Sequence, residues 1–428
     1  MRDFKKLFKI IWKRFGLWVI LLSLFTAMIG SLNVQDKVKY DVVTLRESVE
    51  KMAEDTNISI DTSRIDNEFL DEADKVAKAY VDKYEIIATS SIDIKDEEKY
   101  NRYYEKMSEK YGRPFYEIED PIAMYAYIRN LLISKPLDFY DTEMTEESYP
   151  DSYAIEFVRS SIIPILLLVG LISFLITSLE QSLPSYEFTM MYPWRKRDEV
   201  WMKSILSFIF GIITLAIVLL VGGGVLKSSA LGSAISFAGI TSHVLNHIII
   251  ILATSILSVA TGMIAGNLIG HFGMFIIAGS GVTIIRYIIY VFLEIFNNGS
   301  GKSFDRAFSN FEMSLPRFLK PFITIFNTSG ELPEDLGYLT LAIIWAVIAY
   351  VINNKINAEK SGYLVISKPF EVIAKVLGTL ATTSILYMIL NSSLLNSQSI
   401  VINIICYVLS LLLSYKLFDI LFKVRLKF

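Results

Sequence analysis

Two long apolar runs, residues 160–179 and 204–225, constrain this chain most strongly. Each run is about 20 residues long, the length that a helix needs to cross a hydrocarbon core roughly 30 Å thick. Of the 428 residues, 53% are hydrophobic, more than in an average soluble domain. We therefore expect an all-α polytopic membrane protein, in contact with the lipid bilayer along much of its length.

We predict about eight transmembrane helices, with both termini in the cytoplasm. Basic residues are retained on the cytoplasmic side of a membrane protein, and the basic clusters of this chain fall on that side in every well-populated loop. Residues 1–16 are predicted to form a cytoplasmic amphipathic helix, or equally a charged run that only orients the first span. Within a transmembrane domain that otherwise covers residues 158–428, the predicted spans are 17–32, 160–179, 204–225, 243–268, 272–296, 337–352, 376–390 and 399–415.

Residues 33–157 differ in composition, with roughly twice as many acidic as basic residues. The positive-inside rule gives no reason to keep such a segment in the cytoplasm, so we predict an extracellular domain after the first span. Residues 61–63 are expected to cap a helix that follows them. Apolar residues recur at helical spacing, which predicts a mostly helical domain, in residues 42–52, 69–80, 103–111 and 122–132.

No motif of this chain gives strong support for catalysis or for metal binding. The single cysteine, Cys406, excludes an intramolecular disulfide. His243 and His247 have the spacing of two metal ligands, but no carboxylate or cysteine accompanies them, so an interfacial position is favoured and no metal site is predicted. Residues 298–303 resemble the end of a phosphate-binding loop but lack its first glycine and a preceding strand. We therefore expect neither an enzyme nor a nucleic-acid-binding protein.

Two features inside the predicted spans indicate close packing or a polar interior. Gly262, Gly266 and Gly270 recur every fourth residue and allow close helix approach, for which packing within the chain is favoured over a dimer face. Arg286 is a charge inside the fifth span, with Glu294 two turns further on, either as its partner or as an interfacial acid. Such charges usually face a polar interior, so Arg286 is expected either to line a substrate pathway or to clamp helices together.

Residues 180–203, between the second and third spans, carry the most specific pattern. Apolar side chains suited to a groove on a partner protein are flanked there by charges. A second predicted cytoplasmic loop, residues 353–375, carries Glu359, Gly362 and Lys368. The residues of the first pattern are Tyr186, Glu187, Met190, Met191, Tyr192, Pro193, Trp194, Arg195 and Lys203.

These residues resemble the cytoplasmic loop of type-two ABC transporter permeases. In that family a glutamate and a run that ends in proline precede a lysine at the next span, and Trp194 stands where a small residue is more usual. The second loop is similar to the Glu-x-x-Gly loop of eight-span permeases from Gram-positive bacteria, which also carry an external domain between spans one and two. The resemblance implies that residues 180–203 form a coupling helix in a groove of a separate ATP-binding subunit.

The resemblance further implies a permease subunit of an ABC exporter in the plasma membrane of a bacterium. Such a subunit works as a homodimer or heterodimer with two ATP-binding subunits, which hold ATP and Mg, so this chain is expected to hold no cofactor itself. The expected cargo is amphiphilic, such as a peptide, an antibiotic or a lipid-like molecule. The alternative is an ABC-coupled mechanotransmission, sensor or resistance module, whose external domain acts without a substrate crossing the membrane.

Overall fold

The structure, a computed structural model, is helical through most of the residues that it describes. Among the described residues, eight helices are long and apolar enough to cross a membrane. This finding confirms the predicted helical fold and agrees with a polytopic architecture, whereas the extracellular position of residues 33–157 stays a prediction. The structure describes residues 2–84, 121–133, 152–182, 196–296, 299–327, 331–353, 362–391 and 399–425, together with Glu105, Leu137 and Phe139.

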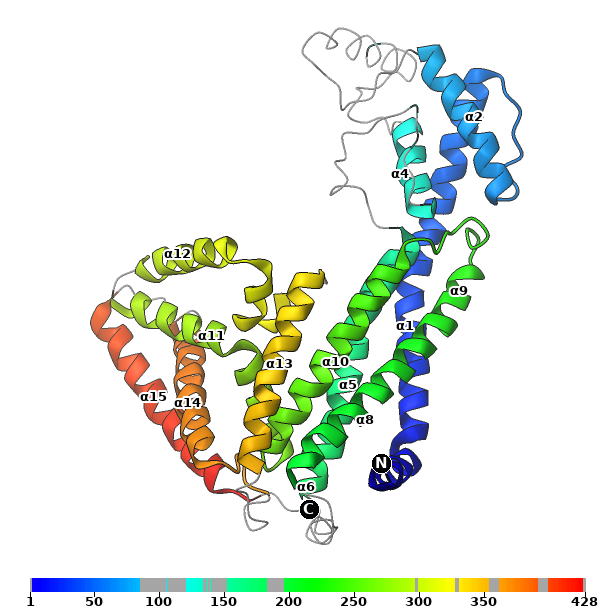
Figure 1. Ribbon diagram of the computed structural model, residues 1–428. Helices are drawn as coiled ribbons and strands as arrows, with labels where there is room; N and C mark the ends of the chain where they lie inside the picture. Colours follow the sequence, from blue (N-terminus) through cyan, green and yellow to red (C-terminus); the bar gives the residue numbers. More distant parts are fainter. Residues whose placement is uncertain are drawn as a thin grey trace. The chain divides into compact units, whose positions relative to one another are not determined.

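Seventeen elements follow one another along the described chain (Figure 1). They are α1 (Arg2–Thr56), α2 (Asn67–Tyr84), α4 (Pro121–Ile133), α5 (Tyr153–Phe174), η4 (Leu175–Leu179), α6 (Glu180–Ser182), α8 (Lys196–Ile217), η5 (Val218–Gly222), α9 (Gly223–Lys227), α10 (Ile240–Ile264), α11 (Leu268–Phe296), α12 (Ser300–Ser314), η6 (Arg317–Phe322), η7 (Ile325–Asn327), α13 (Leu332–Asn353), α14 (Lys368–Leu390) and α15 (Ile400–Lys423).

The chain forms two compact units. The helices α1, α5, α8 and α10 each contribute residues to both units, and each unit is described by itself below. Unit 1 comprises Met1–Ile20, Pro164–Thr214 and Leu245–Phe428, and unit 2 comprises Leu21–Ile163 and Leu215–Val244.

In unit 2, the helix α1 continues well past the predicted first span. Residues 42–52 are part of this one helix and do not begin a new one, because no glycine or proline interrupts the chain between residues 31 and 56. The helix ends where Asn57 adopts the left-handed conformation, with φ 54°. The buried stripe on this part of α1 has a spacing of three or four residues and consists of Val34, Val38, Val42, Leu45, Val49 and Met52.

The helices α2 and α4 confirm the predicted helical stretches 69–80 and 122–132. Asp74 of α2 accepts a hydrogen bond of 2.7 Å from the Tyr125 hydroxyl and pairs with Arg129 of α4 at 2.6 Å. Burial, together with the nearby Asp74 charge, raises the pKa of Tyr125 above its ordinary value. This buried polar cluster fixes how α2 and α4 lie against each other. Residues 103–111, the remaining predicted stretch, lie outside the described residues apart from Glu105.

The predicted cap at residues 61–63 is wrong for α2. Asp66 is the capping residue, since its Oδ1 accepts a hydrogen bond of 2.9 Å from the backbone N–H of Phe69. Asp61 forms a local turn in which its carboxylate accepts from the Ser63 N–H at 2.9 Å. Hydrogen bonds from Ser63 hold the pKa of Asp61 below its ordinary value.

In unit 1, α10 is the most buried of the candidate spans. It packs closely on α8, because a Cβ atom added at Gly211 would lie 2.4 Å from the Ile251 side chain. The Thr254 hydroxyl of α10 meets the Tyr338 hydroxyl of α13 at 3.0 Å. The helices α14 and α15 lie side by side (Figure 1) and are joined by Lys375 and Asp419, whose charged atoms are 2.8 Å apart.

The predicted fifth span is broken near its middle. At Ser280 the backbone leaves the helical region, with φ −147° and ψ 21°, so α11 consists of two shorter helices. Hydrogen bonds to the segment around η7 stabilise the break, because Ser280 meets Thr324 at 3.0 Å and the Thr283 hydroxyl donates to the Ile323 carbonyl at 3.1 Å. The helix α12 packs along the part of α11 that follows the break (Figure 1). Neither half reaches the roughly 20 residues that a full crossing needs.

Candidate functional site

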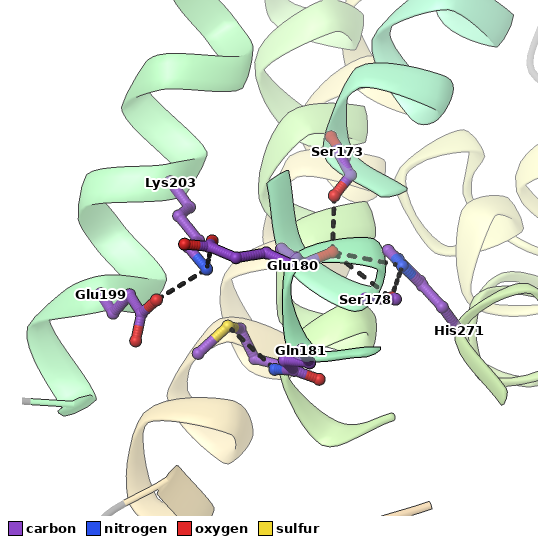
Figure 2. A network of polar contacts seen from close by, with 9 residues as sticks. Ser173, Ser178, Glu180, Gln181, Glu199, Lys203 and His271 are labelled. Carbon is purple, nitrogen blue, oxygen red and sulfur yellow. Dashed lines mark hydrogen bonds and ion pairs between the residues drawn. The ribbon is translucent and has the colours of Figure 1, made fainter. Parts of the chain in front are cut away.

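A buried polar network lies in unit 1 where α6 ends, α8 begins and α11 follows α10 (Figure 2). The helices that meet there belong to four different candidate spans. The network contains Ser173, Thr177, Ser178, Glu180, Gln181, Glu199, Lys203, Ser207, Ser258, Met263 and His271.

Lys203 of α8 forms the charged part of this network. Its Nζ lies 2.8 Å from the Oε2 of Glu180 and 2.6 Å from the Oε1 of Glu199. The lysine is 0% exposed, and a charge removed from water to this degree needs well-placed partners to offset its lost hydration. Glu199 stands one helical turn before Lys203, which is a favourable spacing for an ion pair. We call this arrangement the Lys203 clamp.

The Lys203 clamp joins the two ends of residues 183–195. This segment leaves α6 just after Glu180 and enters α8 just before Glu199. Because Lys203 holds both carboxylates, the end of α6 and the start of α8 are cross-linked to each other.

His271 of α11 forms a second part of the network and is fully buried. Its Nε2 lies 2.6 Å from the Ser258 carbonyl, which can only accept, so Nε2 donates this hydrogen bond. Its Nδ1 lies 2.5 Å from the Ser178 hydroxyl. Figure 2 shows the imidazole turned toward Ser178. His271 thus connects α11 to α10 and to the end of the span that begins with α5.

Ser178 and Thr177 occupy a wide helical turn. The residues of η4 form a π-helix, and such single wide turns are frequent at functional sites. Close to this turn, the hydroxyl groups of Ser173 and Ser207 lie 2.7 Å apart and join α5 to α8. The π-helical turn therefore lies between two polar connections, one to α8 and one to His271.

Residues 362–367 are hydrogen-bonded to the turn between α10 and α11. Ala265 and Val365 form an antiparallel β-bridge, and the Asn267 side chain donates to the Gly362 carbonyl at 3.0 Å. This arrangement, which we call the turn anchor, fixes the end of residues 354–361 that leads into α14. Three backbone hydrogen bonds complete it: Gly362 N to Gly266 O at 2.9 Å, Gly266 N to Leu364 O at 3.3 Å, and Ile366 N to Ile264 O at 3.0 Å.

The glycine repeat makes room for these contacts. A Cβ atom added at Gly262 would lie 2.4 Å from the His271 ring, so this position does pack within the chain as predicted. At Gly266 and Gly270 the close neighbour is a loop and not a helix, because added Cβ atoms would lie 2.3 Å and 1.7 Å from the carbonyl oxygens of residues 363 and 364. Two of the three glycines thus serve the turn anchor.

Two aromatic side chains near the start of α1 pack on α8. The rings of Trp12 and Phe210 are stacked with centroids 5.8 Å apart, and Phe8 stacks on both. Phe210 is fully buried and lies two turns after Lys203 on α8. The start of α1 is therefore attached to the helix that carries the clamp.

Arg286 clamps α12 onto α11. Its Nε donates to Asp305 at 2.7 Å, its Nη1 to Glu312 at 3.1 Å and its Nη2 to the Ser309 hydroxyl at 2.7 Å. The guanidinium also lies 4.7 Å from the centre of the Phe308 ring. Every one of these partners is on α12.

Glu294 binds the start of the same helix and does not pair with Arg286. Its carboxylate accepts hydrogen bonds from the N–H groups of Gly299, at 3.2 Å, and Lys302, at 3.1 Å. A carboxylate at a helix N-terminus is a favourable arrangement. These contacts favour the helix-clamping role of Arg286, and its role in a substrate pathway stays a prediction.

The structure describes part of the predicted coupling residues. Lys203 belongs to the clamp, Gly362 belongs to the turn anchor, and Lys368 is exposed at the start of α14. Sequence reasoning missed the roles of Glu180, Glu199 and His271. The remaining predicted coupling residues lie outside the described residues: Tyr186, Glu187, Met190, Met191, Tyr192, Pro193, Trp194, Arg195 and Glu359.

Comparisons with known proteins were made by family, by sequence and by structure. No protein-family model matches the chain. No curated protein matches it. No solved structure matches it. Among the described residues, no group of three or more histidine, cysteine, aspartate or glutamate side chains is arranged to hold a metal ion.

Proposed function

We propose that this chain is the membrane permease subunit of an ATP-driven ABC exporter. Residues 183–195 dock on a separate ATP-binding subunit, which holds ATP and Mg. Closure of that subunit displaces the segment, and the spans rock to move an amphiphilic substrate across the plasma membrane of a bacterium. Two ATP-binding subunits and a second permease, identical or different, complete the assembly.

The Lys203 clamp is the observation that carries this proposal. A flexible loop absorbs a push, whereas a segment whose two ends are cross-linked passes the push into both attached helices. The charges of the clamp are 2.6–2.8 Å apart and Lys203 is fully buried, so a desolvated ion pair holds the end of α6 to the start of α8. The apolar residues that precede it, such as Met190, Met191 and Trp194, have the character of interface anchors.

The turn anchor supports a second attachment point. It holds residues 362–367 against the turn between α10 and α11, so that a displacement of the neighbouring residues 354–361 reaches two further candidate spans. Glu359 lies within that segment. In this proposal the ATP-binding subunit contacts both segments, and the first provides the larger share of the contact.

Co-purification tests the proposal. The chain is expressed with candidate ATP-binding subunits from the same host, and the wild type is compared with the double reversal Glu187→Arg with Arg195→Glu. We expect the wild type to retain an ATP-binding subunit and the double reversal to lose it while remaining inserted in the membrane. If the wild type retains none of the candidates, the exporter assignment loses its main support.

A second function is favoured by the length of α1. The part of α1 that lies in unit 2, residues 21–56, corresponds to about 54 Å at 1.5 Å per residue, more than the roughly 30 Å of a hydrocarbon core. A helix of this length can serve as a mechanical arm. In the mechanotransmission alternative, the ATPase moves this arm and no substrate crosses. A transport assay in vesicles with ATP separates the two, because only the exporter accumulates substrate.

A further inference from the structure

A buried carboxylate in the first turn of α13 is unlike the other acids of unit 1. Asp335 is 0% exposed, and neither of its carboxylate oxygens has a hydrogen-bond partner. Glu180 and Glu199, by contrast, share the ammonium group of Lys203. Asp335 is therefore a buried acid whose charge nothing in the described chain balances.

The surroundings of Asp335 are closely packed. A Cβ atom added at Gly337 would lie 2.0 Å from the Phe318 carbonyl oxygen, so α13 and η6 touch backbone to backbone. Tyr338, one turn after Asp335 and hence on the same face of α13, meets Thr254 of α10. Asp335 thus belongs to the sealed side of α13, where water does not reach its oxygens.

Few charged groups lie on the elements that pack here. Glu334, the residue before Asp335 on α13, forms an ion pair of 3.7 Å with Lys320 of η6. The charge of this lysine is therefore already balanced by Glu334. Arg317 of η6 pairs with the half-buried Glu331. On α10, His247 stands two turns before Thr254 and makes contacts of its own. None of these groups forms an ion pair with Asp335 among the described residues.

An ionised carboxylate at such a position is very unfavourable. Removing the charge from water without a partner costs far more than the start of a helix returns through its dipole. The group therefore has to be neutral or has to hold a cation. A metal ion needs several oxygen ligands, and no cluster of three or more acidic, histidine or cysteine side chains surrounds the position in the described chain. A proton needs only the carboxylate.

We propose that Asp335 is a proton-binding site. Its carboxyl group is protonated while α13 is packed against α10, and it releases the proton when this packing opens and water reaches it. Proton binding therefore favours the packed arrangement of α13 and α10, and low proton concentration favours its opening. This inference does not depend on the exporter assignment.

Infrared difference spectroscopy tests the proposal directly. The purified full-length protein in lipid nanodiscs is recorded at neutral and at alkaline pH, and the carbonyl stretch of protonated carboxylic acids is followed. We expect a protonated-carboxyl band near neutral pH in the wild type and its loss in Asp335→Asn, which has nearly the same shape. Glu334→Gln, the matched control on the neighbouring residue, should retain the band. Absence of the band in the wild type, or its persistence in Asp335→Asn, overturns the proposal.

Thermal unfolding provides a second measurement, which also separates a proton from a metal cation. Because the folded state binds a proton that the unfolded state releases, the wild-type Tm should fall as pH rises from about 6 to about 9, more steeply than the Tm of Asp335→Asn. Replacing sodium and potassium ions by choline should leave the wild-type Tm unchanged. Equal slopes in the two proteins contradict the proposal, as does a stabilisation by sodium or potassium that requires Asp335.

Discussion

The Nζ atom of Lys203 lies 2.8 Å from the Oε2 atom of Glu180, across a segment whose two ends these residues mark. The same ammonium group holds Glu199 at 2.6 Å. One fully buried side chain thus connects the end of one candidate span to the start of the next. In the proposed function, a push on the intervening residues 183–195 reaches both of these helices through this connection.

Removing the lysine should destabilise the protein strongly. Lys203→Met leaves the carboxylates of Glu180 and Glu199 partly buried without a cation, for which we expect a loss of about 3–5 kcal/mol in the free energy of unfolding. Denaturant unfolding in detergent micelles measures this loss. The neutral triple variant, with Glu180→Gln and Glu199→Gln added, should regain much of the stability. Equal losses in the single and triple variants would show that the charges are not what holds the two helix ends together.

The turn anchor predicts a sharp difference between two glycines of α11. Gly270→Ala places a methyl group against the carbonyl of Leu364, 1.7 Å from its oxygen before any shift. We expect a loss of about 1–3 kcal/mol, with faster hydrogen exchange at the backbone N–H groups of Gly362 and Ile366. The control is Gly273→Ala, where an added methyl group has no neighbour within 4 Å. Similar exchange in both variants would contradict this account of the glycine repeat.

Arg286 should control the attachment of α12. Arg286→Gln removes hydrogen bonds to Asp305 and Glu312, each worth about 1.5–3 kcal/mol when a charge is involved. Hydrogen exchange over residues 300–314 should therefore become faster. Arg306→Gln, on the exposed side of the same helix, serves as the control and should leave exchange unchanged. If α12 is equally protected in both variants, the guanidinium does not hold it.

The stacked aromatic rings predict unequal roles for two tryptophans of α1. Trp12 stacks on Phe210 and Phe8, whereas Trp18 is 63% exposed. Trp12→Ala should lose about 0.5–1.5 kcal/mol for each stacked pair beyond its lost burial. Limited proteolysis near the N-terminus, with Trp18→Ala as the control, detects release of this part of α1. Equal cleavage of the two variants would indicate that the stack does not hold α1 to α8.

The number of long apolar helices was predictable because a helix that satisfies its own backbone is what an apolar run of 20 residues forms in a bilayer. The break at Ser280 could not be predicted from hydropathy, since residues 268–296 form one continuous apolar run. The break depends on a hydrogen bond to Thr324, 44 residues away. The pair of glycines that flank Ser280 is the one local signal that pointed to it.

The candidate site was predictable only in part. Lys203 was found through its place in a family-like pattern, and the spacing of Glu199 and Lys203 could have suggested their ion pair. No spacing rule relates Glu180 to a lysine 23 residues later, because the two residues lie on different helices, α6 and α8. The glycine repeat revealed a close approach, but a repeat cannot say whether a helix or a loop is the neighbour.

Retention of an ATP-binding subunit by the Lys203→Met variant tests the central claim most directly. Wild type, Lys203→Met and the control Arg306→Gln are purified with the ATP-binding subunit that co-purifies with the wild type, and the bound amount is measured per folded permease. The clamp account predicts a marked loss in Lys203→Met alone, while its elution on gel filtration stays that of the wild type. Full retention by a folded Lys203→Met protein would show that the partner does not depend on the clamp, and would contradict the account.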